Sequence, residues 1–138
     1  MTNKLNSVLL IDDDEGTNYI NRKIVENADI AHHIQTTLNG KEAIQYLTHT
    51  GIYEQLAYPQ PELILLDINM PVMDGWEFLE AYHHLEESQK TKAIIVMLTT
   101  SFNPDDKTRA EKNANISGFK YKPLTMEMVN EIMTEHFV

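Results

Sequence analysis

Short apolar runs, each followed at once by a charged or polar residue, alternate along this chain with stretches of helical periodicity. The run Leu63-Ile64-Leu65-Leu66 is apolar throughout and is followed directly by Asp67. An uninterrupted apolar strand is typical of the centre of a parallel sheet, where helices cover both faces. Strands that alternate with helices in this way predict βαβ units and therefore an α/β domain.

The predicted elements follow this alternation along the whole chain. We expect strands at residues 7–11, 33–37, 63–66, 93–98 and 118–121. We expect helices at residues 15–27, after a cap at Asn39, at residues 75–87, from Pro104 and from Thr125. By its apolar spacing, the first helix is expected to turn four residues towards the core: Ile20, Ile24, Val25 and Ala28.

The segment at residues 48–61 is long for a connection between a helix and a strand. Its large side chains, Tyr53, Leu56 and Tyr58, either extend the preceding helix or pack the loop. Two prolines end any helix before the next strand.

Composition narrows the classes of function. The chain has 138 residues, which suits one domain, and a net charge of −10, which disfavours binding to nucleic acid or to an anionic membrane. No apolar run approaches the length of a membrane span, and the polar N-terminus carries no signal-peptide core. The absence of cysteine is compatible with the cytoplasm, which is the expected location.

Chemically useful side chains follow four of the predicted strands. Asp12 and Asp13 follow the first strand, Asp67 the third, Thr99 the fourth and Lys122 the fifth. Because ligands bind at the carboxyl ends of parallel strands, these groups are expected to meet at one edge of the sheet. Singly, each has an ordinary explanation, such as a helix cap for the aspartates. Together they indicate a site for a hard divalent cation and a phosphoryl group.

Charge explains why these residue types belong together. A carboxylate attacks a phosphoryl dianion poorly because the two repel, and Mg²⁺ between them removes much of that repulsion. We expect Asp13 and Asp67 to bind the ion directly and Asp12 to act through water. Lys122 adds a positive charge, and Thr99 can donate a hydrogen bond to a phosphoryl oxygen.

Four motifs make the chain resemble the receiver domains of two-component response regulators. They are Leu10-Ile11-Asp12-Asp13, the segment LLDINMPVMDG at residues 65–75, Leu98-Thr99-Thr100 and Phe119-Lys120-Tyr121-Lys122-Pro123. The resemblance covers essentially the whole chain, so we expect one receiver domain over residues 1–138 and no output domain. It implies a flavodoxin-like fold, a doubly wound parallel sheet of five βα units with strand order 2-1-3-4-5.

The resemblance also assigns roles at the acidic end of the site. It implies that Asp67 accepts a phosphoryl group from a histidine kinase or a histidine phosphotransfer protein. Asp12 and Asp13 become the acidic pair that binds Mg²⁺ with Asp67, and the backbone carbonyl of Asn69 joins the metal ligands.

A second set of roles concerns switching. By the same resemblance, Thr99 is the switch hydroxyl, Phe119 the switch aromatic and Lys122 the active-site lysine, joined to Pro123 by a cis peptide bond. Phosphorylation would then change the surface of the fourth helix, fifth strand and fifth helix, which contacts a downstream protein. The alternative for Phe119 is an ordinary aromatic residue on an edge strand.

Two features depart from the usual receiver pattern. The residue after the switch hydroxyl is usually small, and here it is Thr100. The long segment at residues 48–61 makes the chain similar to the longer receivers that pair with phytochrome-type kinases, and it is also compatible with a tolerated surface insertion.

The leading hypothesis is a signalling module and not an enzyme. One alternative is an Mg²⁺-dependent aspartyl-phosphate phosphatase, but such enzymes usually carry an acid two residues after the nucleophile, where this chain has Asn69. A flavin carrier of the same fold is disfavoured because the carboxylates after the first strand would repel the cofactor phosphate. A phosphorelay intermediate, which passes the phosphoryl group onward, remains open.

Overall fold

Five parallel strands form one sheet in the order β2-β1-β3-β4-β5. The computed structural model describes residues 4–85 and 93–137. The strands are β1 (Leu5–Ile11), β2 (Ala31–Thr37), β3 (Leu63–Leu66), β4 (Ile94–Thr99) and β5 (Gly118–Tyr121). This order confirms the flavodoxin-like fold, in which the chain winds first to one side of β1 and then to the other.

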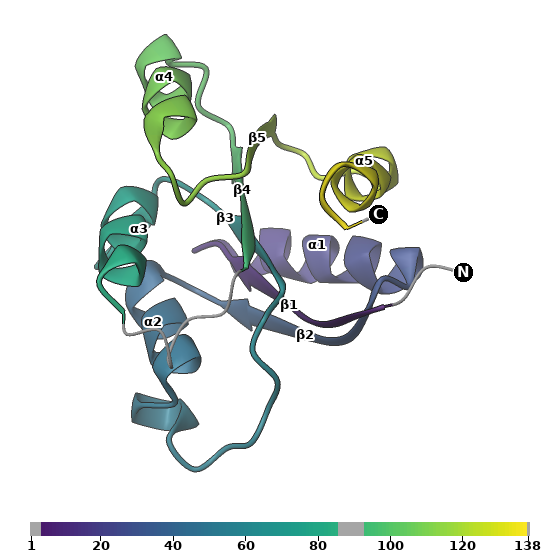
Figure 1. The fold of residues 1–138 in the computed structure, drawn as a ribbon, viewed down its shortest axis with the longest axis vertical. Coiled ribbons are helices and arrows are strands. Elements are labelled where there is room, and N and C mark those ends of the chain that lie inside the picture. The colour runs from purple at the N-terminus through teal and green to yellow at the C-terminus, as the bar shows by residue number, and fades with distance from the viewer. Residues whose placement is uncertain (1–3, 86–92, 138) are drawn as a thin grey trace.

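Helices cover both faces of this sheet (Figure 1). They are α1 (Glu15–Ala28), α2 (Gly40–Thr48), α3 (Gly75–His83), α4 (Pro104–Lys112) and α5 (Met126–His136), with a short 3₁₀ helix, η1 (Gly51–Tyr53), after α2. Helices α1 and α5 lie on one face, and α2 and α3 lie side by side on the other. Among the described residues, no helix has the length and apolar character needed to cross a membrane.

The core consists of two apolar clusters, one on each face of the sheet. All four residues of β3 are buried, as its composition predicts. Ile64 and Leu66 belong to the cluster under α2 and α3, whereas Leu63 and Leu65 belong to the cluster under α1 and α5. The alternation places the end of β3 at the middle of the domain, with helices on both sides.

Most predicted boundaries are confirmed within one or two residues. Strands β1 and β2 each begin two residues before the predicted start, and β4 is displaced by one residue towards Thr99. Helix α3 ends at His83 and not at the predicted Glu87, and residues 86–87 lie outside the described part of the chain.

The prediction for the core face of α1 is wrong at Ile20. Val25 is buried and Ile24 and Ala28 pack against the core, but the Ile20 side chain is 59% exposed. The buried positions of the first half of α1 carry Asn18 and Asn21 instead. Asn18 is buried because its amide donates hydrogen bonds to backbone carbonyls at the ends of β1 and β2, which an apolar side chain cannot do.

The segment at residues 48–61 packs as an aromatic cluster and does not extend α2. The Tyr58 ring lies between Tyr46 and His49, with centroids 4.1 Å and 4.3 Å away and nearly parallel planes. The Tyr58 hydroxyl donates to the carbonyl of Tyr46, and the Tyr53 hydroxyl donates to Glu42 at 2.8 Å. Leu56, in contrast, is 55% exposed.

We expect Tyr58→Ala to lower the free energy of unfolding by about 2 kcal/mol, because it removes two stacked ring contacts and a hydrogen bond. Leu56→Ala, in the same segment, is the matched control and should change it by less than about 0.5 kcal/mol. Urea denaturation of both variants makes the comparison. Equal losses would mean that the stack does not anchor the segment.

Candidate functional site

The ends of β1 and β3 bring three carboxylates together. One oxygen each of Asp12, Asp13 and Asp67 lies within 4.8 Å of the other two. Asp12 and Asp67 are buried, with exposures of 4% and 7%, and Asp13 is exposed. These three residues therefore lie together at one edge of the sheet, as expected from the sequence.

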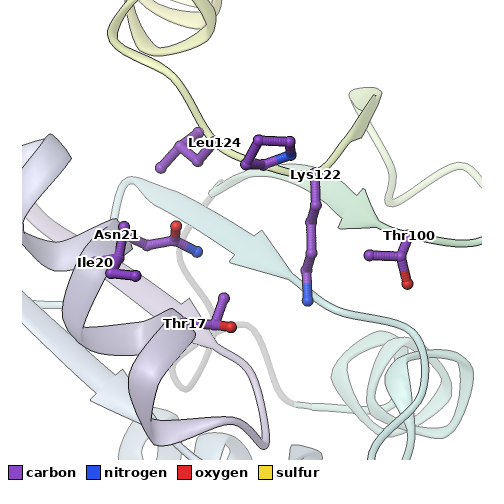
Figure 2. Close-up of a pocket in the computed structure, with 7 residues that line it drawn as sticks. Thr17, Ile20, Asn21, Thr100, Lys122 and Leu124 are labelled. Atoms are coloured by element: carbon purple, nitrogen blue, oxygen red, sulfur yellow. The ribbon is translucent and has the colours of Figure 1, made fainter.

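Lys122 lies beside two of these carboxylates. It follows β5, and its Nζ lies 2.5 Å from Oδ2 of Asp12 and 3.3 Å from Oδ1 of Asp67. The Lys122–Pro123 peptide bond is cis, as expected. Figure 2 shows the side chain extending from the connection between β5 and α5, with Thr17 and Thr100 to either side.

The carboxyl of Asp67 is electrostatically unusual. Burial raises the pKa of Asp67 to about 6; the Lys122 ammonium opposes this rise, and the charge of Asp12 adds to it. Burial alone would lower the pKa of Lys122, but its hydrogen bond to Asp12 and the charges of both aspartates outweigh burial, and the pKa is raised. Lys122 therefore stays charged at neutral pH.

Backbone contacts orient Asp67. Its amide donates to the carbonyl of Ile11 at 3.0 Å, which continues the pairing of β3 with β1. Its Oδ1 accepts from the Ile68 amide at 2.9 Å and also faces Lys122. Within the described part of the chain, Oδ2 of Asp67 has no hydrogen bond, so this oxygen is available for chemistry.

The loop from β3 to α3 is tightly turned. Val72 has a φ of 72°, and the Met73 amide donates to the Pro71 carbonyl at 2.9 Å, which makes a three-residue γ-turn. A left-handed conformation is unfavourable for a β-branched residue. At the start of α3, a Cβ on Gly75 would overlap the carbonyl of Asp67, so only glycine permits this approach. Asn69 lies exposed in the same loop.

Thr99 at the end of β4 is fully buried, and its Oγ1 accepts a hydrogen bond from the Ser101 amide at 3.0 Å. The Ser101 hydroxyl in turn donates to Asp106 in the first turn of α4, at 2.6 Å. Thr99 is thus joined to α4 through two consecutive hydrogen bonds. Thr100, the departure from the usual receiver pattern, is exposed.

The predicted switch aromatic, Phe119, is half-buried on β5 and packs against the cluster under α2 and α3. Its ring lies edge-on to Tyr121, with centroids 5.4 Å apart. Tyr121 stacks on Phe102, which is 78% exposed. The three rings form a row from the sheet edge to the loop before α4.

Sequence reasoning missed three residues that support the site: Asn18, Ser101 and Asp106. The available signal for Asn18 was its position one turn before Asn21 and two turns before the buried Val25, on the face that α1 turns to the sheet. Ser101 and Asp106 carried no comparable signal, because a serine and an acidic first turn are ordinary features of a helix start.

The residues at the strand ends fit a hard divalent cation. Three carboxylates and one ammonium leave an excess of negative charge in a partly buried site. Oxygen ligands of this kind are those that Mg²⁺ and Mn²⁺ prefer. Asp12, Asp13 and Asp67 are the residues that could hold such an ion.

Comparison with known proteins agrees with this arrangement. The sequence model of the response regulator receiver domain matches residues 8–134. The response regulator Rcp1 of Synechocystis sp. is 34% identical over 100 residues, covering 72% of this chain and 65% of Rcp1. The Mn²⁺-bound structure of Rcp1 is similar with a TM-score of 0.78 at 27% identity, covering 96% of each chain.

Two further solved structures are similar over nearly the whole chain. A two-component response regulator from Cytophaga hutchinsonii has a TM-score of 0.82 at 33% identity, covering 96% of each chain. The phosphorylated cyanobacterial phytochrome response regulator RcpA has a TM-score of 0.74 at 26% identity, covering 94% of this chain and 89% of RcpA.

The chain belongs to the response regulator receiver domain family, the signalling modules of two-component systems. Its similarity to phytochrome response regulators confirms the narrower resemblance seen in the sequence.

Relieving the strain at Val72 should stabilise the protein. Asparagine tolerates positive φ better than valine, so we expect Val72→Asn to raise the free energy of unfolding by about 1 kcal/mol. Val72→Thr keeps the β-branched shape and should leave it unchanged. Thermal denaturation of the two variants checks this, and a destabilised Val72→Asn would contradict the argument from strain.

The metal-free protein should also show a pH dependence that arises from Asp67. Its folded pKa is about 6, above the ordinary value of 3.8, so the folded state holds this proton more tightly than the unfolded state. The free energy of unfolding should therefore fall as pH rises from about 4 to about 6, by at most about 3 kcal/mol from this group.

The measurement is the difference between the parent and Asp67→Asn, taken in EDTA across this range, since the variant lacks the titrating group. We expect the variant to gain stability relative to the parent as pH rises. Parallel stability curves would show that Asp67 titrates normally.

Proposed function

We propose that Asp67 accepts a phosphoryl group from a phosphohistidine of a histidine kinase or histidine phosphotransfer protein. In this transfer, a carboxylate oxygen of Asp67 forms a bond to phosphorus while the phosphorus–nitrogen bond of the phosphohistidine breaks. The electron pair of that bond stays on the leaving imidazole, which takes up a proton. The product is an acyl phosphate on Asp67.

The observation that carries this proposal is the convergence of Asp67 with Asp12, Asp13 and Lys122. One oxygen of Asp67 is held by a backbone amide and by Lys122, whereas the other has no hydrogen bond among the described residues. A fixed carboxylate with one available oxygen is suited to nucleophilic attack. The lysine charge near it favours the approach of an anionic phosphoryl group.

Mg²⁺ is the proposed cofactor, held by Asp12, Asp13, Asp67 and the backbone carbonyl of Asn69. When bound, the ion neutralises the carboxylates and screens them from the phosphoryl oxygens. The carboxylate cluster and the Mn²⁺-bound structure of the relative Rcp1 support this part of the proposal. The phosphorylated structure of the relative RcpA supports phosphoryl acceptance.

Lys122 and Thr99 have complementary proposed roles once the phosphoryl group is present. The Lys122 ammonium, 3.3 Å from Asp67, would pair with a phosphoryl oxygen. The Thr99 hydroxyl would donate a hydrogen bond to another oxygen. Because its oxygen accepts from Ser101 here, Thr99 retains its own proton for that purpose.

A cavity beside Lys122 offers a place for the phosphodonor partner. It measures about 320 Å³ and is lined by α1, by Thr100 and by the connection from β5 to α5 (Figure 2). Ile20, the residue wrongly assigned to the core, lies at this cavity and is largely exposed, as is the neighbouring Tyr19. Exposed apolar side chains next to a reactive site suit a protein partner.

The direct test is phosphorylation with acetyl phosphate and Mg²⁺, followed by intact-mass measurement. We expect the parent to gain one phosphoryl group and Asp67→Asn to gain none. Asp14→Asn is the matched control, because Asp14 caps α1 and lies outside the three-carboxylate cluster, and asparagine also caps helices. Equal labelling of Asp67→Asn and the parent would overturn the assignment of Asp67.

We further propose that phosphorylation moves Thr99 and so changes the surface of α4, β5 and α5, through which a downstream protein is contacted. The contacts that support this are the hydrogen bonds from Thr99 through Ser101 to Asp106, and the ring of Phe119, which lies edge-on to Tyr121, the residue of β5 that is paired with Thr99. The change is a shift between two populations set by the difference in their contacts.

Hydrogen exchange with and without beryllofluoride tests this coupling at residues 102–113 and 117–121. We expect Thr99→Ala to retain phosphorylation at Asp67 but to show less than about half of the parental exchange response. Thr100→Ala removes a neighbouring exposed hydroxyl and should respond as the parent does. A full response in Thr99→Ala would show that this hydroxyl does not couple the site to the surface.

A further inference from the structure

Asn18 occupies a position that an apolar residue normally fills. It lies in the first half of α1, is 4% exposed, and faces the ends of the strands that carry the acidic residues. Its Nδ2 donates to the carbonyl of Asp12 at 2.9 Å and to the carbonyl of Thr37 at 3.2 Å. Because both partners are carbonyls, the amide nitrogen and not the oxygen must face them.

These two bonds join three elements at the metal end of the sheet. The Thr37 carbonyl also accepts from the Asp12 amide at 3.1 Å. Asn18 therefore joins α1 to the residue that follows β1 and to the last residue of β2, and the peptide that it holds is the one between Asp12 and Asp13. Both of these residues belong to the carboxylate cluster.

The oxygen of this amide has no partner in the part of the chain that the structure describes. Oδ1 of Asn18 is buried and makes no hydrogen bond to any described residue. Asn18 also lines a small cavity of about 10 Å³, together with Asp12, Asn21 and Asp67. Such a volume is about the least that holds one water molecule, and a buried water requires several polar partners. Here the cavity wall provides an amide oxygen and two carboxylates.

We infer that Asn18 is a positioning residue for the carboxylate cluster and that the cavity beneath the cluster binds one ordered water. The water donates one hydrogen to Oδ1 of Asn18 and the other to a carboxylate oxygen of Asp12 or Asp67. Asn18 thereby fixes the backbone of Asp12 and Asp13 directly and the carboxylate side chains through the water.

This inference rests on the proposed function, because positioning is useful only if the cluster binds a divalent cation. Two carboxylates that follow β1 and one that follows β3 bind the same ion only when the ends of these strands keep their spacing. Removing a residue that hydrogen-bonds to the metal ligands commonly weakens metal binding by tenfold or more.

The test is the affinity for Mg²⁺, measured by calorimetry, of Asn18→Leu and Asn18→Ala. We expect binding about tenfold weaker than in the parent for both variants. Val25→Ala is the matched control: Val25 is also buried on α1, but it packs in the apolar cluster under α1 and α5 and does not line the cavity. We expect the control to bind Mg²⁺ as the parent does.

A kinetic measurement separates positioning from a general loss of structure. With acetyl phosphate, the Mg²⁺ concentration for half-maximal phosphorylation should rise about tenfold in Asn18→Leu, whereas the rate at saturating Mg²⁺ should stay within about twofold of the parent. A high-resolution crystal structure of the parent should show a water bonded to Oδ1 of Asn18, a readout that requires no variant.

The outcomes are distinguishable. If the parent binds Mg²⁺ but the Asn18 variants bind it as tightly as Val25→Ala does, the positioning role is overturned while the proposed function stands. An empty cavity in the parent crystal overturns the bound water. If the parent neither binds Mg²⁺ nor accepts a phosphoryl group, the proposed function fails and this inference fails with it.

Discussion

Repulsion among buried carboxylates at the ends of β1 and β3 is the constraint on which the rest of the site depends. Two like charges 4.8 Å apart repel by about 3–4 kcal/mol at the effective dielectric typical of proteins. A chain gathers them only if neighbouring groups offset that cost. Lys122 does so in part. Burial, together with the charge of Asp12, still raises the pKa of Asp67 to about 6, so the ionised form of this carboxyl remains disfavoured in the metal-free site. The site is thus arranged for an additional positive charge.

The topology is what brings the compensating lysine to the carboxylates. Asp12 and Lys122 are 110 positions apart in sequence, and they meet because parallel strands all end at the same edge of the sheet. The chain changes winding direction between β1 and β3, so the helices that follow these two strands diverge to opposite faces. This divergence leaves the ends of β1 and β3 accessible, although both strands are buried.

The sequence predicts those parts of the site whose position follows from a single local pattern of residues. The apolar run of β3 can be buried only in the centre of the sheet, and the charged residue that follows it must then lie at the edge. Ile20 shows where such reasoning fails. An apolar residue at helical spacing is exposed here because Asn18 and Asn21 occupy the inward positions. The spacing of Asn18 and Asn21 with Val25 is compatible with an inward position, but it does not reveal the carbonyl groups of other elements that make a polar residue favourable there.

The segment at residues 48–61 illustrates the same limit. Its tyrosines predict packing, but the stack of Tyr58 between Tyr46 and His49 depends on the path of the loop over α2. The geometry of the acidic site is less dependent on such details, since each of its residues follows a strand whose position in the sheet is determined by hydrophobic burial.

Helix α4 is held differently from the other helices. Ala110 is its one buried residue, so little apolar area anchors it to the sheet. Two further contacts of α4 are polar or aromatic: Asp106 accepts from Ser101, and the Arg109 guanidinium lies 4.3 Å from the centre of the Trp76 ring. Short helices depend on tertiary packing for their stability, so an element with so few buried contacts can change position at small free-energy cost. The helix that is joined to Thr99 by hydrogen bonds is therefore also the one that the core restrains least, which supports the proposal that its surface responds to phosphorylation.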